Sequence, residues 1–269
     1  MKKLSIAILP LVAFSLNTVT HAATSDGKTF GVSAGWLHVM PQSSGQGVYG
    51  KTGNSPLLGA MANLQAANPD AGFEVQDADT AGLMLDYFVN DNVSLELTLG
   101  VPPEMELAGK GAIKLGNETI LDLNQFDKAA TTDAYTPTIS ARYHFGSINN
   151  KIRPYVGAGL MYAHFSNVET DSAINDALKA TKLAPFNPQL GKVKVDDAVA
   201  PVAMLGIDYS INKNWYATAS VSYAHLTTKA KLNVNGTNPY TGGSMTLISG
   251  QSDIEIKPIV TYLGLGYRF

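Results

Sequence analysis

The sequence predicts an all-β protein, an eight-stranded antiparallel transmembrane β-barrel with short periplasmic turns and long extracellular loops. Three observations predict this class: polar and apolar residues alternate through eight segments, short and long connections alternate between the segments, and aromatic residues gather at two levels. The composition agrees, since 45% of the 269 residues are hydrophobic and only 15% are charged. A disordered chain would be poorer in apolar residues, and a bundle of transmembrane helices would need several apolar runs of about 20 residues.

The first residues are expected to be a signal peptide. Met1-Lys2-Lys3 is basic, Leu4–Leu16 is apolar but too short for a stable membrane anchor, and Thr20-His21-Ala22 supplies small residues for cleavage. We therefore expect residues 1–22 to be removed and residues 23–269 to form a single outer-membrane β-barrel domain. Cleavage leaves 17 of the 19 basic residues, scattered along the chain, against 22 acidic ones. This balance argues against a nucleic-acid interface, which needs clustered positive charge.

Eight segments of the chain alternate with a period of two. Side chains of a β-strand point to opposite faces in turn, so this period indicates strands that separate two environments. In the first segment Phe30, Val32, Ala34 and Trp36 share one face, and glycine and serine share the other. The eight segments comprise residues 30–36, 82–87, 93–100, 138–145, 155–162, 203–209, 215–223 and 263–269.

The lengths of the connections favour a membrane barrel over a soluble one. Residues 89–92, 146–151 and 212–214 form short turns rich in Asn, Asp and Gly. The long polar loops between them are expected at residues 41–75, 109–130, 167–196 and 232–252. Short turns at one end and long loops at the other are typical of outer-membrane barrels. Within the loops, residues 55–69 and 171–184 carry apolar residues and helix-start signals that predict short helices.

Aromatic residues on the apolar face lie at two distances from the short turns. Two such rings are the girdles expected at the two membrane–water interfaces, whereas the core of a soluble sandwich does not require them. The lower ring comprises Phe30, Tyr87, Tyr143, Phe145, Tyr209, Trp215, Tyr267 and Phe269, and the upper ring Trp36, Tyr162 and Tyr223.

The inward face of the barrel carries charges near the short turns. An eight-stranded barrel is narrow enough to be filled by side chains, so these charges are expected to pair into a polar plug on the periplasmic side. The alternative interpretation is a proton relay or a catalytic acid–base pair. The residues are Asp86, Glu96, Arg142, His144, Arg153, Asp208 and Arg268.

Farther up, the inward side chains become apolar. Thioethers and small aliphatic groups beside glycines suit an adaptable apolar cavity, and packed filler is the alternative. The residues are Leu37, Val39, Met84, Met161, Val202, Met204, Val260 and Tyr262. At this height Pro102, Pro103 and Pro137 interrupt two adjacent strands, and proline removes a donor from the ladder. The prolines indicate either a lateral opening in the wall or ordinary strand ends.

Four stretches of the chain carry a family resemblance. They are Leu83-Met84-Leu85-Asp86-Tyr87-Phe88 with Asn90-Asp91-Asn92-Val93 and Glu96; Ile152-Arg153-Pro154-Tyr155-Val156-Gly157-Ala158-Gly159; Ile211-Asn212-Lys213-Asn214-Trp215; and Leu265-Gly266-Tyr267-Arg268-Phe269. In this order they resemble the OmpW/AlkL family of small outer-membrane barrels. The resemblance implies an apolar interior that is closed toward the periplasm and opens sideways into the bilayer, and an association with uptake of small hydrophobic molecules. The first, second and third long loops are longer than, or different from, what the resemblance leads us to expect.

The expected function is passive admission of small hydrophobic molecules through the apolar cavity, with lateral exit into the bilayer of the outer membrane of a Gram-negative bacterium. This function needs no cofactor and no metal. The expected partners are outer-membrane lipid and lipopolysaccharide, the hydrophobic solute and, during biogenesis, the barrel-assembly machinery. We expect a monomer or small oligomer.

Three other function classes were weighed. A structural or adhesion barrel, whose extracellular loops bind partners without transport, stays open as an alternative. A polar porin is disfavoured because eight strands leave little lumen and the plug would obstruct it. Catalysis needs a nucleophile beside a base, and neither His38 nor His164 is accompanied by a nucleophile signature. The chain also has no cysteine that could act as a nucleophile. On both grounds we expect no enzyme and no catalytic residues.

Overall fold

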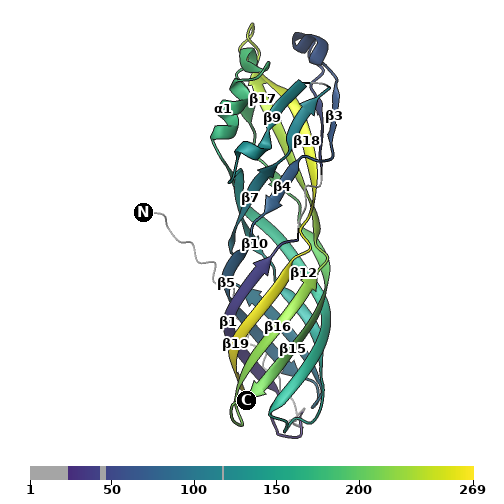
Figure 1. The fold of residues 1–269 in the computed structure, drawn as a ribbon, viewed down its shortest axis with the longest axis vertical. Helices are drawn as coiled ribbons and strands as arrows, with labels where there is room; N and C mark the ends of the chain where they lie inside the picture. The colour runs from purple at the N-terminus through teal and green to yellow at the C-terminus, as the bar shows by residue number, and fades with distance from the viewer. Residues whose placement is uncertain (1–23, 43–46, 117) are drawn as a thin grey trace, which may run out of the picture.

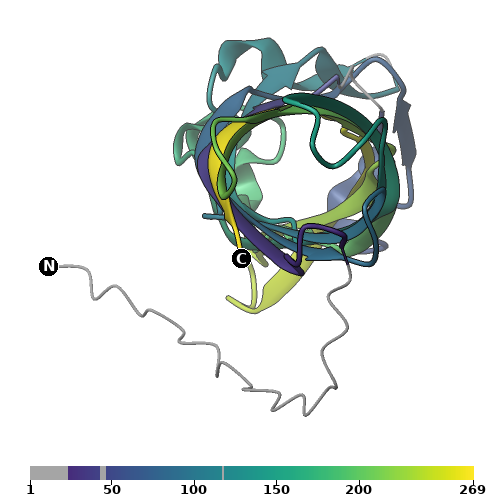
Figure 2. The same ribbon diagram turned by 90° about the horizontal axis from the view of Figure 1, so that it is seen from below.

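A closed barrel forms the lower part of the molecule in the computed structural model, which describes residues 24–42, 47–116 and 118–269. The expected signal peptide lies outside these residues. Each barrel strand pairs antiparallel with the next one, and β1 pairs with β19 from Gly31↔Arg268 to Met40↔Ile259, which closes the ring (Figure 2). The strands, in order around the ring, are β1 (Phe30–Met40), β5 (Ala78–Phe88), β6 (Val93–Gly100), β11 (Thr138–His144), β12 (Ile152–Thr170), β15 (Ala198–Ser210), β16 (Trp215–Ala224) and β19 (Ile259–Arg268). The predicted fold class is confirmed.

Two of the short turns are built in the same way from Asn-x-Asn sequences. The side chain of Asn90 accepts hydrogen bonds from the backbone amides of Asn92, at 2.9 Å, and Val93, at 2.8 Å. Asn212 accepts bonds of 2.9 Å from the amides of Asn214 and Trp215. An Asn side chain that mimics a backbone turn in this way reverses the chain within a few residues. The sequence therefore fixes the register of two strand pairs locally.

The alternation in sequence corresponds to an outer and an inner face. Apolar side chains such as Leu205, which is 62% exposed, cover the outside of the barrel, while the residues between them point inward. The predicted lower ring is exposed and in mutual contact, with Trp215 and Tyr267 5.2 Å apart and Phe30 and Tyr87 5.5 Å apart between ring centroids. The upper aromatic ring also points outward, for example Trp36. An apolar surface bounded by aromatic rings fits a bilayer with its two interfaces.

Above the barrel, the chain forms a second tier of strands (Figure 1). The connections at this end are long, as expected, but strands and short helical turns occupy much of their length. One extension continues the barrel sheet beside β12 and consists of β10 (Ala130–Tyr135), β7 (Glu104–Lys110) and β4 (Gly72–Val75). A second sheet contains β17 (Thr227–Thr237), β18 (Ser244–Glu255), β2 (Val48–Thr52), β3 (Gln65–Asn68), β13 (Gln189–Leu190) and β14 (Lys194–Val195). The hairpin of β8 (Ala112–Leu115) and β9 (Glu118–Asp122) completes the tier.

The upper tier has its own apolar core, which includes Leu58, Leu123, Phe186 and Leu247. The expected first helix is only a 3-10 turn, η1 (Pro56–Met61), followed by strand β3, because Gly59 leaves the helical conformation at φ 53°. The second is α1 (Ala173–Lys179) with the 3-10 turn η3 (Ala184–Phe186), and a further turn is η2 (Leu123–Gln125). Among the described residues, no helix is long and apolar enough to cross a membrane.

Candidate functional site

A buried ion-pair cluster occupies the lower half of the barrel interior. Arg142 on β11 forms an ion pair with Asp86 on β5 and a second one, of 2.8 Å between Nη1 and Oε2, with Glu96 on β6. All three side chains are at most 3% exposed. The guanidinium also lies 4.8 Å above the ring of Tyr155. One buried cation therefore serves two carboxylates, an arrangement that binds three consecutive strands together on the inner face of the wall.

His144 and Asp208 form a second pair beside this cluster. His144 Nδ1 lies 3.3 Å from Asp208 Oδ2, and its Nε2 lies 2.9 Å from the hydroxyl of Ser94. The hydroxyl of Tyr216 donates to Asp86 at 3.1 Å. Tyr216 lies flat against the barrel wall at Gly266, where a Cβ atom would stand 2.2 Å from the ring. Glycine at this position makes space for the tyrosine that completes the hydrogen bonds of Asp86.

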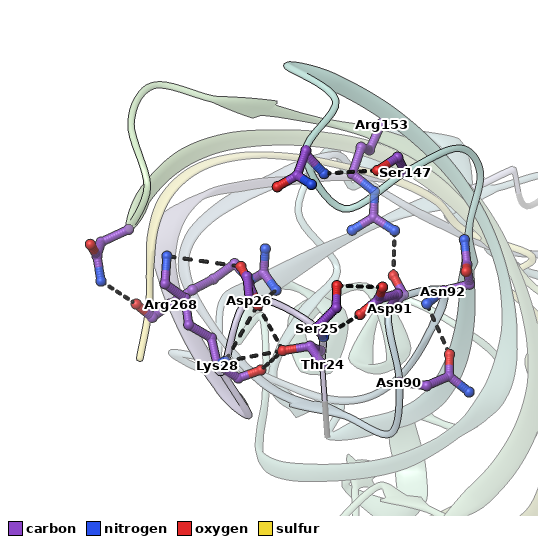
Figure 3. A network of polar contacts seen from close by, with 12 residues as sticks. Thr24, Ser25, Asp26, Lys28, Asn90, Asp91, Asn92, Ser147, Arg153 and Arg268 are labelled. Carbon is purple, nitrogen blue, oxygen red and sulfur yellow. Dashed lines mark hydrogen bonds and ion pairs between the residues drawn. The ribbon is translucent and has the colours of Figure 1, made fainter. Parts of the chain in front are cut away.

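The periplasmic end of the barrel is bridged by the segment before β1 (Figure 3). Ser25 donates from its amide and its hydroxyl to the two carboxylate oxygens of Asp91, each at 2.7 Å. Arg153 donates to the backbone carbonyl of Asp91 at 2.5 Å, and Arg268 lies 3.6 Å from the carboxylate of Asp26. Of the seven predicted plug residues, these two arginines thus contact the periplasmic segment and its turn, whereas the other five pair with one another.

The contact between Ser25 and Asp91 is expected to be pH-dependent. The amide and then the hydroxyl of Ser25 hold the pKa of Asp91 below its usual range. Because the pKa of Asp91 is lower in the folded than in the unfolded state, its ionised carboxylate stabilises the fold at pH values above the unfolded-state pKa of about 3.9. This stabilisation is lost as the pH falls through the folded-state pKa. We expect the hydrogen-exchange protection of the Ser25 amide to fall below about pH 4. Asp91→Asn should lower this protection at pH 7, and equal protection of the wild type at pH 7 and pH 2 would contradict the assignment.

An apolar cavity lies above the ion-pair cluster. All eight residues predicted for it line one cavity of about 120 Å³, which is several times the space that one water molecule requires. Leu37, Met84 and Tyr262 pack together at its lower end. Met161 and Val202 belong to a larger apolar cluster on the opposite wall. The cavity therefore begins directly above the charged layer.

The upper wall of the cavity comes from residues that the sequence analysis missed. Val75 on β4, Met105 and Leu107 on β7, and Ile254 on β18 all line it. They belong to segments interpreted as loops or left unassigned. In β17, buried or half-buried residues alternate with exposed ones over all 11 positions. That period of two was the signal for strands with one face toward water and the other toward the interior.

The prolines interrupt the wall between two ladders. Pairing of β6 with β11 ends at Thr98↔Thr138, and pairing of β7 with β10 begins at Glu104↔Asp133. The two ladders differ in register by one residue, as expected for an irregularity at positions that lack a donor. Between them, a backbone hydrogen bond of 3.2 Å runs across the wall from the amide of Ala134 to the carbonyl of Pro103. The stretch comprises residues 99–103 and 134–137, of which Gly100, Val101, Pro103, Ala134 and Thr136 line the cavity. Pro102 and Pro137 are half-buried beside it.

Two histidines on the outer surface hold aspartates near the upper aromatic ring. His38 Nδ1 lies 2.8 Å from Asp79, which also accepts a bond of 2.9 Å from Trp36. His164 Nδ1 lies 2.8 Å from Asp197. Within the described ranges, no three His, Asp or Glu side chains gather closely enough to hold a metal ion. Both pairs point outward, away from the cavity.

Comparison with known proteins agrees with this architecture. The model of the OmpW family matches residues 55–269. The chain belongs to the OmpW family. It is 30% identical over 202 residues to outer membrane protein W of Vibrio cholerae, covering 75% of this chain and 79% of that protein. It is 25% identical over 214 residues to outer membrane protein AlkL of Ectopseudomonas oleovorans, covering 79% and 75% respectively.

Solved structures show the same fold. The crystal structure of OprG from Pseudomonas aeruginosa matches with a TM-score of 0.65 at 22% identity, covering 90% of this chain and 96% of that one. The family membership and this fold confirm the predicted resemblance and place this OmpW-family chain in the outer membrane of a Gram-negative bacterium.

Proposed function

We propose that this OmpW-family barrel passively admits small hydrophobic molecules through its apolar cavity and releases them sideways into the bilayer. The observation that supports the proposal most directly is the vertical division of the interior. A cavity lined mainly by apolar side chains ends directly above a buried ion-pair cluster. The free energy of an apolar solute falls when the solute leaves water for the cavity, and it would rise again in the charged layer.

The interrupted wall supplies the exit. Residues 99–103 and 134–137 join two ladders through few backbone bonds, and several of them line the cavity. Val101 lines the cavity and is also 62% exposed, and Ile139, which is 59% exposed, lies outside next to this stretch. A solute that leaves the cavity at this height enters hydrocarbon without crossing the polar leaflet of lipopolysaccharide. The route needs no cofactor, no metal and no catalytic residue. Lipopolysaccharide, the solute and the barrel-assembly machinery are its proposed partners.

Probe entry into liposomes tests the proposal. The full-length mature protein would be reconstituted into outer-membrane-like liposomes, and the entry of an alkane-like fluorescent probe would be followed together with planar-bilayer conductance. We expect probe entry above that of empty liposomes, without large ohmic conductance. Entry equal to that of empty liposomes would reject transport and favour a barrel whose extracellular tier binds partners. A large conductance would indicate a polar pore instead.

A second variant tests the lateral exit. Gly100 lies in the interrupted stretch and lines the cavity, and a Cβ atom there would stand 3.5 Å from Leu37. Gly100→Trp is expected to obstruct the opening and to slow probe entry about tenfold, since a barrier raised by 1.4 kcal/mol has that effect. Ala81→Trp places the same side chain on the exposed face of the adjacent strand β5 and serves as the control. Equal rates for the two variants would argue against exit at this position.

A further inference from the structure

Glu96 is the one charged side chain among the described residues that line the apolar cavity. No Lys, Arg or His side chain is part of this lining. Its other polar side chains are hydroxyls, and those from strands of the barrel itself are Thr80, Thr98, Thr138, Ser220, Ser222 and Tyr262. A passage for purely apolar solutes needs no carboxylate, so its presence at the lower end of the cavity calls for a specific chemical role.

Two hydroxyl hydrogens next to this carboxylate are already donated to it. Thr98 donates to Glu96 Oε1 at 3.0 Å and Ser140 donates to the same oxygen at 3.4 Å. The hydroxyls of Tyr262 and Ser33 share a bond of 3.0 Å. A hydroxyl that donates its single hydrogen keeps its lone pairs. The lower end of the cavity therefore offers more acceptor lone pairs than free hydroxyl hydrogens.

The charge around Glu96 is negative in excess. Glu96 and Asp86 share a single cation, Arg142, whereas Asp208 has His144 beside it and lies opposite Arg153 in the pairing of β12 with β15. The remaining arginines of the interior are directed toward the periplasmic segment, as described above. In a site of low effective dielectric constant, an uncompensated charge acts strongly on a ligand.

We propose, resting on the uptake function above, that the lower end of the cavity is a headgroup subsite for amphiphiles that carry a hydrogen-bond donor, with a primary ammonium preferred over an alcohol and a carboxylate disfavoured. The apolar tail lies against Met84, Met161 and Met204, whose thioethers adapt to varied chains. The tail extends toward the interrupted wall, which begins at Leu99, about 10 Å along β6 from Glu96 at 3.3 Å per residue. The head is held at Glu96 while the tail reaches the exit.

Competition among ligands with one tail and different heads tests the subsite. The full-length mature protein in lipid nanodiscs would bind an apolar fluorescent dye, and decylamine, 1-decanol and decanoate would displace it at pH 7.4, with empty nanodiscs subtracted. We expect decylamine to bind about tenfold more tightly than decanoate, as one charge-assisted hydrogen bond would give. Decanol should fall between them.

Variants separate the carboxylate from the rest of the cavity. Glu96→Gln is expected to remove the preference for decylamine over decanol, whereas Glu106→Gln, the same change on the exposed face of β7, should keep it. Because Glu96→Gln also takes a partner from Arg142, Thr98→Val and Tyr262→Phe provide a second measurement, in which affinity for decanol should fall.

The outcomes of this competition are distinct. Binding of the dye without any headgroup preference, or a preference that survives in Glu96→Gln, would overturn the subsite and leave apolar uptake intact. Absence of dye binding to the wild-type protein would overturn both proposals.

Discussion

Replacing Arg142 with methionine is expected to destabilise the barrel by about 3–5 kcal/mol, the usual cost of removing one partner from a buried ion pair. The change leaves the carboxylates of Asp86 and Glu96 in the lumen without their shared cation. Neither side chain is more than 2% exposed, so water does not replace the guanidinium. The free energy of unfolding, measured by urea titration of the protein in phospholipid vesicles, checks the expectation.

A triple variant identifies the origin of the loss. Asp86→Asn and Glu96→Gln together with Arg142→Met remove all three charges, and such replacements are often close to neutral in stability. We expect the triple variant to be more stable than Arg142→Met alone. If it is as unstable as the single variant, packing of the arginine against Tyr155, at 4.8 Å, is responsible, and electrostatics is not.

The barrel strands were predictable because each separates two environments. Lipid outside and a filled lumen inside impose opposite demands on successive side chains, and an apolar outer face makes the period of two conspicuous. In β17 the period persists, but Lys229 and Lys231 occupy the outer face while Ala230 points inward. The outer face of this tier is polar, as expected for strands surrounded by water. A search for strands that requires an apolar outer face therefore classifies the segment as a loop.

The cavity lining and the interrupted wall were predictable to different degrees. The inward positions of Met161 and Met204 follow from alternation alone, because a strand has only two faces. The pairing of Arg142 with Asp86 does not, since these residues lie on strands that are not adjacent, β11 and β5. Alternation states which face a side chain occupies, but the registers of β5, β6 and β11 decide which side chains meet over the strand between them. The interrupted wall likewise required the registers of two ladders, which the prolines alone do not give.

Introducing aspartate at Met161 and Met204 is expected to reduce entry of an alkane-like probe at least tenfold. Both thioethers line the cavity, on the adjacent strands β12 and β15. A carboxylate there attracts water, and an apolar solute must spend free energy to displace that water. Each 1.4 kcal/mol of this cost lowers the occupancy of the cavity by the solute about tenfold. The measurement is the initial rate of probe entry into liposomes that contain equal amounts of folded protein.

Two further variants distinguish cavity chemistry from a general effect of the substitution. Met40→Asp places the same charge at the upper end of β1, on a residue that does not line the cavity, and should retain probe entry. Met161→Leu keeps an apolar side chain of similar volume and should retain most of it as well. If the double aspartate variant still admits the probe at the wild-type rate, solutes bypass this cavity. The proposed lateral exit from the cavity would then be rejected as well. Loss of probe entry in the double aspartate variant, together with its retention in Met161→Leu, would assign the route to the apolar lining of the cavity. Aspartate makes this lining polar, whereas leucine keeps it apolar.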